Sequence, residues 1–375
     1  MLNAIAVYFS HIFENDISKD ETERYAYEIE SIEPIAEKNK DYENRAPRQK
    51  MDRLLRYKEM LTSIIVKSVS LNFNLPVDEL KQLFDEGEFI LAFYEADRVF
   101  EVAIPDHIEK VVLKKQYNIR EKPRKEFAKY LSDLRFTELL SKANGNEEKA
   151  DAISGWFEKL QNLLRRIFED DTLQLELNED NFSFMIKEKD REPFDLNSMS
   201  DGYAAVLDVV MDLIMRMEFK TNRSFCFDMP GIVLIDEVET HLHIELQKKV
   251  LDLLTTIFPN IQFIMTTHSP FILNSISDCV IYDLETRTLV ENGLSDVPYS
   301  GIVEGYFNSS ELSEKLTKKY ERYRELVKKP DLTDDDFEEI AALEMYLDEI
   351  PDYLAIDFTT EYQRLKLEFE AREDI

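Results

Sequence analysis

The chain has 375 residues, of which 44% are hydrophobic and 33% charged, a composition typical of a globular protein with a sizeable core. Its 77 acidic residues against 46 basic ones give a net charge of −31, which argues against a protein that covers nucleic acid with its whole surface. No run of about 18 apolar residues and no basic, cleavable leader pattern occurs, so we expect no membrane-spanning helix and a cytoplasmic protein. Cys226 and Cys279 lie in apolar sequence and are expected to be buried thiols.

In the first third of the chain, the sequence pattern predicts helices and strands on either side of one highly charged stretch. An apolar helix is expected from Met1 to Phe13, and the charged stretch at about 14–58 is expected to be an exposed, partly helical insertion. The next expected elements are a strand within 63–75, a short helix over 77–88 and a second strand region over 89–104.

The middle and the end of the chain are largely helical in pattern. From Pro105 to about Asp170 the helical pattern is charged and has no sustained heptad repeat, so we expect a short lid or arm rather than a long coiled coil. Residues 173–188 alternate in two runs, which predicts a β-hairpin. After about residue 300 the pattern is helical again, and Thr333 with Asp336 three residues later predicts a capped helix.

The strongest functional signal is the segment GIVLIDEVETHLH, from Gly231 to His243. Its apolar run, Ile232–Ile235, suits a strand buried on both faces of a parallel sheet, and two acids, Asp236 and Glu237, follow at once. Ligands gather at the carboxyl ends of strands in open α/β sheets, where one acid can hold Mg²⁺ and a second can orient a water for attack on phosphorus. The plainer interpretation is an ordinary strand end followed by a polar turn.

A second predicted strand strengthens the functional interpretation. Residues 244–258 have the pattern of an amphipathic helix, and Ile261–Met265 is a second apolar run that precedes His268. Strand, helix and strand form a βαβ crossover, so the two strands are expected to be parallel, with their carboxyl ends at one edge of the sheet. His268 is therefore expected near Asp236 and Glu237, where it could donate a hydrogen bond to a phosphate oxygen.

A third segment lies upstream of these two strands. Apolar residues at helical spacing between Val206 and Met217 predict a helix, and Ser200, Asp201 and Gly202 stand at its start. Such a helix N-terminus offers N–H groups and a hydroxyl to an anion, although the same residues also make an ordinary N-cap.

Together and in this order, the three segments resemble an ABC-type ATPase of the RecF- and SMC-like kind. MSDGY at 199–203 looks like the signature motif, IVLIDE like the Walker B strand with its catalytic glutamate, VETHLH like the D-loop, and TTHSP like the switch-histidine loop. The resemblance is specific over residues 196–283 and weaker at FILAFYEADR. It implies an α/β fold like that of P-loop NTPases, with a mixed sheet, a helical insertion and a helical C-terminal extension.

The resemblance also implies four parts of the chain. These are the remainder of a nucleotide-binding lobe with its charged insertion (1–104), a helical lid or short arm (105–170), a lobe with the signature, Walker B and switch-histidine motifs (171–300), and a helical C-terminal extension (301–375).

As an enzyme, the chain resembles proteins that bind and hydrolyse ATP with Mg²⁺ as a head-to-tail homodimer. By position, Asp236 would help to hold Mg²⁺, Glu237 would polarise the hydrolytic water, and His268 would sense the γ-phosphate. Relatives of this kind serve in DNA repair or anti-phage defence, often with a separate effector protein. The γ-phosphate bound by the opposing subunit would be contacted by Ser200, Asp201 and Gly202.

One motif of the family is absent, because no G-x-x-x-x-G-K-[ST] loop occurs in the 375 residues. In the family this loop runs into a helix that often reads like LNAIA, and this chain opens with MLNAIA. We therefore expect a sequence truncated within or just after the loop, which alone binds ATP weakly or not at all, and a full-length form that hydrolyses ATP slowly and dimerises with ATP. The open alternative is a non-catalytic scaffold or interaction subunit that lends its signature face to an intact ATPase.

Three other interpretations have weaker support in the sequence. A nuclease of the overcoming-lysogenization-defect type would need a Toprim domain, and the segment after about residue 300 is too short and too helical for one. A zinc site at His241 and His243 fails on the spacing of the cysteines. A basic stretch within 110–129 is the candidate surface for DNA or a protein partner, although a solvated face is the plainer interpretation. It has eight basic residues, of which the candidate DNA contacts are Lys110, Lys114, Lys115, Arg120, Lys122, Arg124 and Lys125.

Overall fold

The computed structural model forms two compact units, Met1–Ser295 and Asp296–Ile375. It describes residues 1–14, 71–105, 107–178, 181–189, 191–306, 313–350 and 356–372. The expected charged insertion, and most of the strand expected within 63–75, lie outside the described residues. Across the described ranges, none of the helices combines the length and the apolar composition that crossing a bilayer requires.

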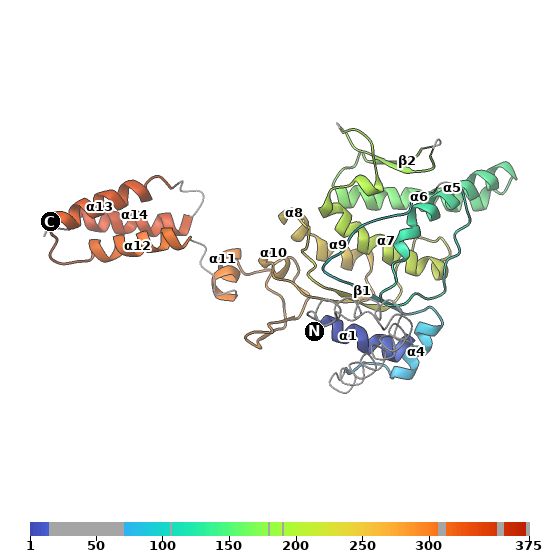
Figure 1. Ribbon diagram of the computed structural model, residues 1–375, viewed down its shortest axis with the longest axis horizontal. Coiled ribbons are helices and arrows are strands. Elements are labelled where there is room, and N and C mark those ends of the chain that lie inside the picture. Colours follow the sequence, from blue (N-terminus) through green and yellow to red (C-terminus); the bar gives the residue numbers. More distant parts are fainter. Residues whose placement is uncertain are drawn as a thin grey trace, which may run out of the picture. The chain divides into compact units, whose positions relative to one another are not determined.

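The first unit is built on a parallel sheet with the strand order β1-β5-β6. Its strand β1 is labelled in Figure 1. Its strands are β1 (Ile90–Tyr94), β5 (Gly231–Ile235) and β6 (Ile261–Met265). Apolar residues fill all five positions of β5, as a central strand covered on both faces requires. The predicted crossover and its parallel register are confirmed, because Ile235 pairs with Met265 at the carboxyl ends of β5 and β6.

Helices cover both faces of this sheet, so the first unit has an α/β fold with three layers. Alternate residues of the strands face opposite sides, as the pleat requires. On β5, Val233 and Ile235 join the larger of two cores, on one face of the sheet, whereas Ile232 and Leu234 join the smaller core on the other face. The α/β class expected from the sequence is therefore confirmed.

The smaller core is formed by the N-terminal helix and the helix before β1. The expected apolar helix is present as α1 (Leu2–Phe9), followed by a π-helical turn at Ser10–Glu14. The expected helix over 77–88 is α4 (Val77–Asp85), and it ends before Gly87, whose φ of 69° lies in the left-handed region that favours glycine. Phe9 and Phe13 of the first segment are almost fully buried in this core.

The larger core lies under a helical hairpin and one long helix. The helices are α5 (Phe127–Ala143), α6 (Glu147–Phe168) and α7 (Asp201–Thr221), and Trp156 of α6 is fully buried among them. The helical pattern expected from Pro105 onward was partly wrong, because residues 107–122 have no helix and a 3-10 turn (Pro123–Glu126) leads into α5. Within this segment, the carbonyl of Ile119 accepts from the backbone N–H of Phe93 in β1 at 2.8 Å.

The predicted hairpin is confirmed as a small antiparallel sheet. It contains β2 (Gln174–Leu177), β3 (Phe184–Lys187) and the short β4 (Phe194–Asp195), in the order β2-β3-β4. A 3-10 turn at Leu196–Ser198 then leads to α7.

The crossover between β5 and β6 departs from the predicted continuous helix. It is broken into α8 (Ile244–Gln247) and α9 (Val250–Ile257), and β6 is less buried than expected, because Ile261 alone in that strand is fully buried. The first unit ends with α10 (Pro270–Leu273) and the antiparallel pair β7 (Ile281–Tyr282) and β8 (Leu289–Val290). The cysteine prediction was wrong for Cys226, which is exposed, while Cys279 is half-buried.

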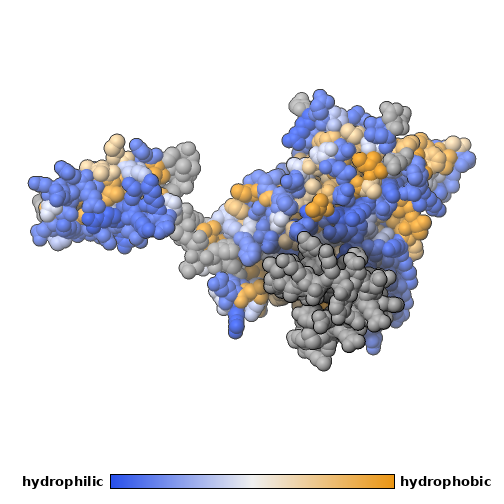
Figure 2. Space-filling model, viewed as in Figure 1, coloured by the Kyte–Doolittle hydropathy of each residue, from blue (hydrophilic) through white to orange (hydrophobic). Residues whose placement is uncertain are grey.

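The second unit starts with α11 (Tyr299–Gly301) and a π-helical turn at Ile302–Tyr306. Its core lies between α12 (Glu314–Val327), α13 (Asp334–Leu347) and α14 (Ile356–Glu370), and the visible face is mainly hydrophilic (Figure 2). The predicted cap is confirmed, because Thr333 and Asp336 form a reciprocal capping box at the start of α13.

Candidate functional site

The two predicted acids follow the central strand at the edge of the sheet. The backbone N–H of Asp236 donates to the carbonyl of Tyr94 at 2.8 Å, which extends the β1–β5 pairing by one residue. The chain then turns sharply, because Glu237 has a φ of 45°, in the left-handed region that a non-glycine residue rarely adopts. The side chain of Asp236 is half-buried and that of Glu237 is exposed, so both are accessible at this edge.

Thr266, directly after β6, joins the two loops that leave the sheet at this edge. Its hydroxyl donates to Oδ1 of Asp236 at 2.6 Å and accepts from the backbone N–H of Glu237 at 2.9 Å. The backbone N–H of Val238 also donates to the carbonyl of Thr266, at 3.1 Å. One threonine therefore orients the first acid's carboxylate and holds the second acid's main chain.

His268 lies in the loop after β6, as the crossover predicted. Its backbone N–H donates to Oε1 of Glu239 at 2.6 Å, and its side chain is exposed. The structure therefore brings the His268 loop and the loop of Asp236 and Glu237 together through Glu239, a residue that the sequence prediction did not single out.

The predicted signature residues begin α7, which starts against the segment that follows the acids. Ser200 is the N-cap of α7 without a side-chain capping bond, and both Ser200 and Asp201 are exposed. Gly202 is buried, and a Cβ there would lie 3.3 Å from the carbonyl oxygen of His241 and 3.3 Å from Cδ1 of Leu246. The close approach of α7 to this segment therefore favours glycine at position 202.

Arg98, which the sequence prediction missed, lies behind the two acids. Its guanidinium donates to the carbonyls of Asp236 at 2.8 Å, Glu237 at 3.2 Å and Glu95 at 3.2 Å. Burial lowers the pKa of Arg98, and the negative charge of nearby carboxylates, that of Asp208 first, opposes this effect. The signal in the sequence was a basic residue shortly after β1, which has no distinctive spacing.

A buried ionic cluster on α7 lies beside Arg98 and was also missed. Asp208 pairs with Arg124, and Asp212 accepts from Arg216 at 2.7 Å and from the hydroxyl of Tyr94 at 2.9 Å. Burial raises the pKa of Asp208 to about 6 although Arg124 opposes the shift. These contacts connect α7 to β1 and to the 3-10 turn before α5.

The basic stretch within 110–129 is only partly available as a binding surface. Arg124 is 2% exposed and belongs to the buried cluster on α7, so its assignment to a DNA-binding surface was wrong. Arg120 pairs with Glu95, and Lys114 pairs with Glu121. The exposed basic side chains of the stretch are Lys110, Lys114, Lys115, Lys122 and Lys125.

The edge presents one oriented carboxylate, that of Asp236, rather than a cluster of metal ligands. The described residues contain no cluster of three or more histidine, cysteine or carboxylate side chains that could hold a metal ion. Mg²⁺ in nucleotide sites is commonly held by one or two carboxylates together with phosphate oxygens and waters, so Asp236 alone fits that role. The start of α1 lies near the same edge, because Arg120 donates to Asn3 at 2.9 Å and pairs with Glu95 just after β1.

Comparison with known proteins identifies a family whose model matches the part of the chain that contains this edge. The family model described as "AAA domain, putative AbiEii toxin, Type IV TA system" matches residues 74–274, more than half of the chain. The match includes the segments of Ser200, Asp236 and His268.

Individual relatives match a smaller part of the chain. The "Septu protein PtuA" of Bacillus mycoides (strain KBAB4) is 40% identical over 97 residues, which are 26% of this chain and 13% of that protein. The "Retron Ec83 probable ATPase" of Escherichia coli is 30% identical over 148 residues, 38% of this chain and 27% of that protein. The chain thus spans less than a third of the length of these relatives. A solved structure titled "Structural biochemistry of ATP-driven dimerization and DNA stimulated activation of SMC ATPases" matches with a TM-score of 0.29 and 16% identity, over 40% of this chain and 91% of that chain.

Proposed function

The chain belongs to the family described as "AAA domain, putative AbiEii toxin, Type IV TA system", as an ABC-type ATPase of the RecF and SMC kind, and we propose that it binds and hydrolyses ATP with Mg²⁺ at the edge of Asp236 and Glu237. The observation that carries this proposal is the pair of acids at the end of a buried parallel strand, with His268 in the adjoining loop.

The two acids have different surroundings and are proposed to have different roles. Asp236, whose Oδ1 is oriented by the hydroxyl of Thr266, would hold Mg²⁺ directly or through a water. Glu237 is exposed and accepts from the hydroxyl of Thr240 at 3.2 Å, so its carboxylate is accessible to a water that it could orient and deprotonate. The metal would supply charge neutralisation at the phosphates.

The remaining predicted residues are proposed to recognise phosphate. The exposed imidazole of His268 would donate a hydrogen bond to the γ-phosphate on the same subunit. Ser200, Asp201 and Gly202 at the start of α7 would meet the γ-phosphate of a second copy in a head-to-tail homodimer, since the hydroxyl of Ser200 makes no capping bond to its own helix.

Turnover of ATP tests this proposal directly. Mg²⁺-dependent phosphate release is measured for the 375-residue chain and for the chain extended at its N-terminus by a G-x-x-x-x-G-K-[ST] loop. Glu237→Gln should lower kcat by about 100-fold or more, because the general base is lost while the shape of the side chain is kept. Glu291→Gln, at an exposed position of the first unit, is the matched control and should leave kcat unchanged.

ATP affinity separates the catalytic proposal from the scaffold alternative. The chain alone should bind ATP weakly, because the loop that cradles the β-phosphate is absent from its sequence, and the extended chain should bind ATP and sediment as a dimer with ATP but not with ADP. An extended chain that neither binds ATP nor dimerises would contradict the ATPase proposal and favour a non-catalytic interaction subunit.

The biological setting is proposed from the relatives. Resemblance to RecF-like ATPases implied DNA repair or anti-phage defence, and similarity to proteins named as Septu and retron components favours defence with a separate effector protein. Interruption of the gene should then increase plaque formation by phage without sensitising the host to DNA damage. Sensitivity to DNA damage with unchanged plaque formation would instead favour a role in repair.

A further inference from the structure

Arg98 makes an unusual set of contacts for a buried cation. It is 7% exposed, yet its described hydrogen bonds are to main-chain carbonyl oxygens, those of Glu95, Asp236 and Glu237. A planar guanidinium can hold two adjacent carbonyls at fixed separation, which a lysine ammonium cannot do in the same way. Arg98 thus binds the main chain of the two acids and makes none of its described hydrogen bonds to their carboxylates.

The backbone at Glu237 has an unfavourable conformation that requires stabilising contacts. Glu237 has a φ of 45°, a conformation that costs free energy in a non-glycine residue and persists only where the surroundings enforce it. Two hydrogen bonds restrain the peptide groups on either side of its Cα. Thr266 accepts from its N–H at 2.9 Å, and Arg98 donates to its carbonyl at 3.2 Å.

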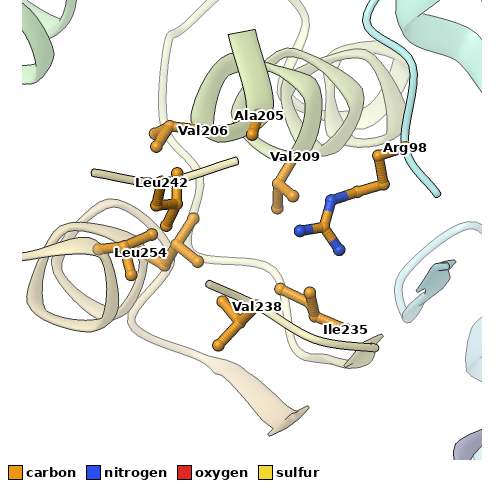
Figure 3. A pocket seen from close by; sticks show the side chains of 9 residues that line it. Arg98, Ala205, Val206, Val209, Ile235, Val238, Leu242 and Leu254 are labelled. Atoms are coloured by element: carbon orange, nitrogen blue, oxygen red, sulfur yellow. The ribbon is translucent and has the colours of Figure 1, made fainter. Parts of the chain in front are cut away.

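The described hydrogen bonds of Arg98 all go to main-chain carbonyls, although the carboxylate of Asp208 lies close enough to oppose the lowering of the Arg98 pKa. The side chain of Arg98 enters a small cavity whose other lining residues are all apolar, among them Val209 of α7 and Val238 of the loop after β5 (Figure 3). A guanidinium placed there keeps its hydrogen bonds only if the carbonyls of Asp236 and Glu237 stay in place, since an unpaired buried charge is costly. The position of Arg98 and the left-handed turn at Glu237 therefore depend on each other.

We propose that Arg98 is a positioning residue for the ATPase reaction, which fixes the main chain of Asp236 and Glu237 so that the Glu237 carboxylate meets the attacking water. This inference rests on the proposed ATPase function. Arg98 acts through the two acids and touches neither nucleotide nor water in this role. Loss of its hydrogen bonds should therefore lower kcat. The KM for ATP should stay nearly unchanged, because Thr266 still orients the carboxylate of Asp236.

Two substitutions and one control test the proposal in the form of the protein that hydrolyses ATP. Arg98→Met keeps the apolar stem and removes the donors, whereas Arg98→Lys keeps the charge and one donor group. Arg165→Ala is the matched control, because Arg165 also donates to a backbone carbonyl, that of Leu173 at 2.9 Å, in a different part of the unit. Each variant is assayed for thermal unfolding, hydrogen exchange of the amides of residues 236–240, and kcat and KM for ATP.

The expected results are specific to Arg98. Arg98→Met should raise the exchange rates of the 236–240 amides and lower kcat by roughly 10- to 100-fold, with KM for ATP within about twofold of the wild type. Arg98→Lys should give an intermediate loss of kcat. Arg165→Ala should change neither the exchange rates of these amides nor kcat. If Arg98→Met does not fold, the same comparison for Arg98→Lys decides the question.

Contradicting results are equally distinct. Unchanged exchange in both folded Arg98 variants, or faster exchange with an unchanged kcat, would overturn the positioning role. A raised KM at constant kcat would also overturn it, since that pattern indicates a contribution to substrate binding. If the wild type shows no turnover that depends on Glu237, the proposed function fails, and hydrogen exchange alone then decides whether Arg98 holds this turn.

Discussion

Buried charges on α7 show how single residues in this chain depend on their surroundings. Glu218 is 1% exposed, accepts from the hydroxyl of Tyr130 at 2.8 Å, and has a pKa that burial raises to about 6. Asp208, near Arg98, shows the same effect in spite of its partner Arg124. In both residues, loss of hydration outweighs the favourable contacts of the charged form.

The raised pKa of Glu218 predicts a pH-dependent stability. Between about pH 4.5 and pH 6 the folded chain holds a proton on Glu218 that the unfolded chain has released, so this residue's contribution to stability falls as pH rises through that window. Glu218→Gln keeps an acceptor for Tyr130 and cannot ionise. The free energy of unfolding of the variant relative to the wild type should therefore increase by on the order of 2 kcal/mol from pH 4 to pH 7.

Chemical denaturation at a series of pH values measures this difference. The variant and wild-type curves should diverge with rising pH and then run parallel above about pH 6. Curves that stay parallel across the whole range would show that Glu218 titrates normally in the folded protein.

The candidate site could be predicted from sequence only where its residues are close to a recognisable strand. Asp236, Glu237 and His268 each follow an apolar run, so the rule that parallel strands end at one edge was enough to bring them together. Arg98 and Glu239 act through hydrogen bonds to main-chain groups of distant segments. No periodicity or spacing in the sequence encodes such a contact, because the partner carries no side-chain signature.

At the scale of elements, the central strand depends on close packing at its first residue. A Cβ on Gly231 would lie 2.5 Å from the carbonyl oxygen of Ile90 and 2.8 Å from Cδ1 of Ile261, so it would collide with both neighbouring strands. Such overlap is relieved only by moving β1 or β6, and these strands carry the loops of the site.

Gly231→Ala should therefore destabilise the first unit by about 1–3 kcal/mol or more, through overpacking. Gly155→Ala in α6 is the matched control, because its added Cβ meets no atom within 4 Å, and alanine in a helix should stabilise by about 0.5–1 kcal/mol. Thermal unfolding of both variants measures the two changes. An equal effect of the two substitutions would contradict the packing argument.

Elements were easier to predict where one pattern dominated their sequence. The strands β5 and β6, the hairpin of β2 and β3, and the helix α7 were predicted with their type and approximate place. The helix expected over 244–258 was predicted as continuous, yet the structure divides it at Lys248–Lys249 into α8 and α9. Apolar spacing continues through that break, so the pattern does not reveal it.

For the whole molecule, the separate core of the second unit predicts separate unfolding. Ten apolar or aromatic residues form a buried cluster from α12, α13 and α14 alone, and Leu326 within it is 2% exposed. A chain with two compact units, each with its own buried residues, is not expected to unfold as one two-state system.

Leu326→Ala should lower the stability of the second unit by about 2–5 kcal/mol and leave the first unit unaffected. Leu367→Ala, at a position that is 64% exposed in the same unit, is the control and should change stability by no more than roughly 0.5 kcal/mol. Differential scanning calorimetry should show one transition shifted and one unchanged. A common shift of the whole trace would show that the two units unfold together.

The bond between Glu239 and the main chain of His268 has a consequence for comparing homologues. The loop is held through the backbone N–H of position 268, while the exposed imidazole is left for chemistry. Relatives that have lost catalysis could therefore vary at 268 while keeping the glutamate at 239. The glutamate maintains the loop conformation, whereas the histidine side chain is needed only for the reaction. In an alignment of such relatives, the glutamate would mark the conserved architecture and the histidine would mark the surviving enzymes.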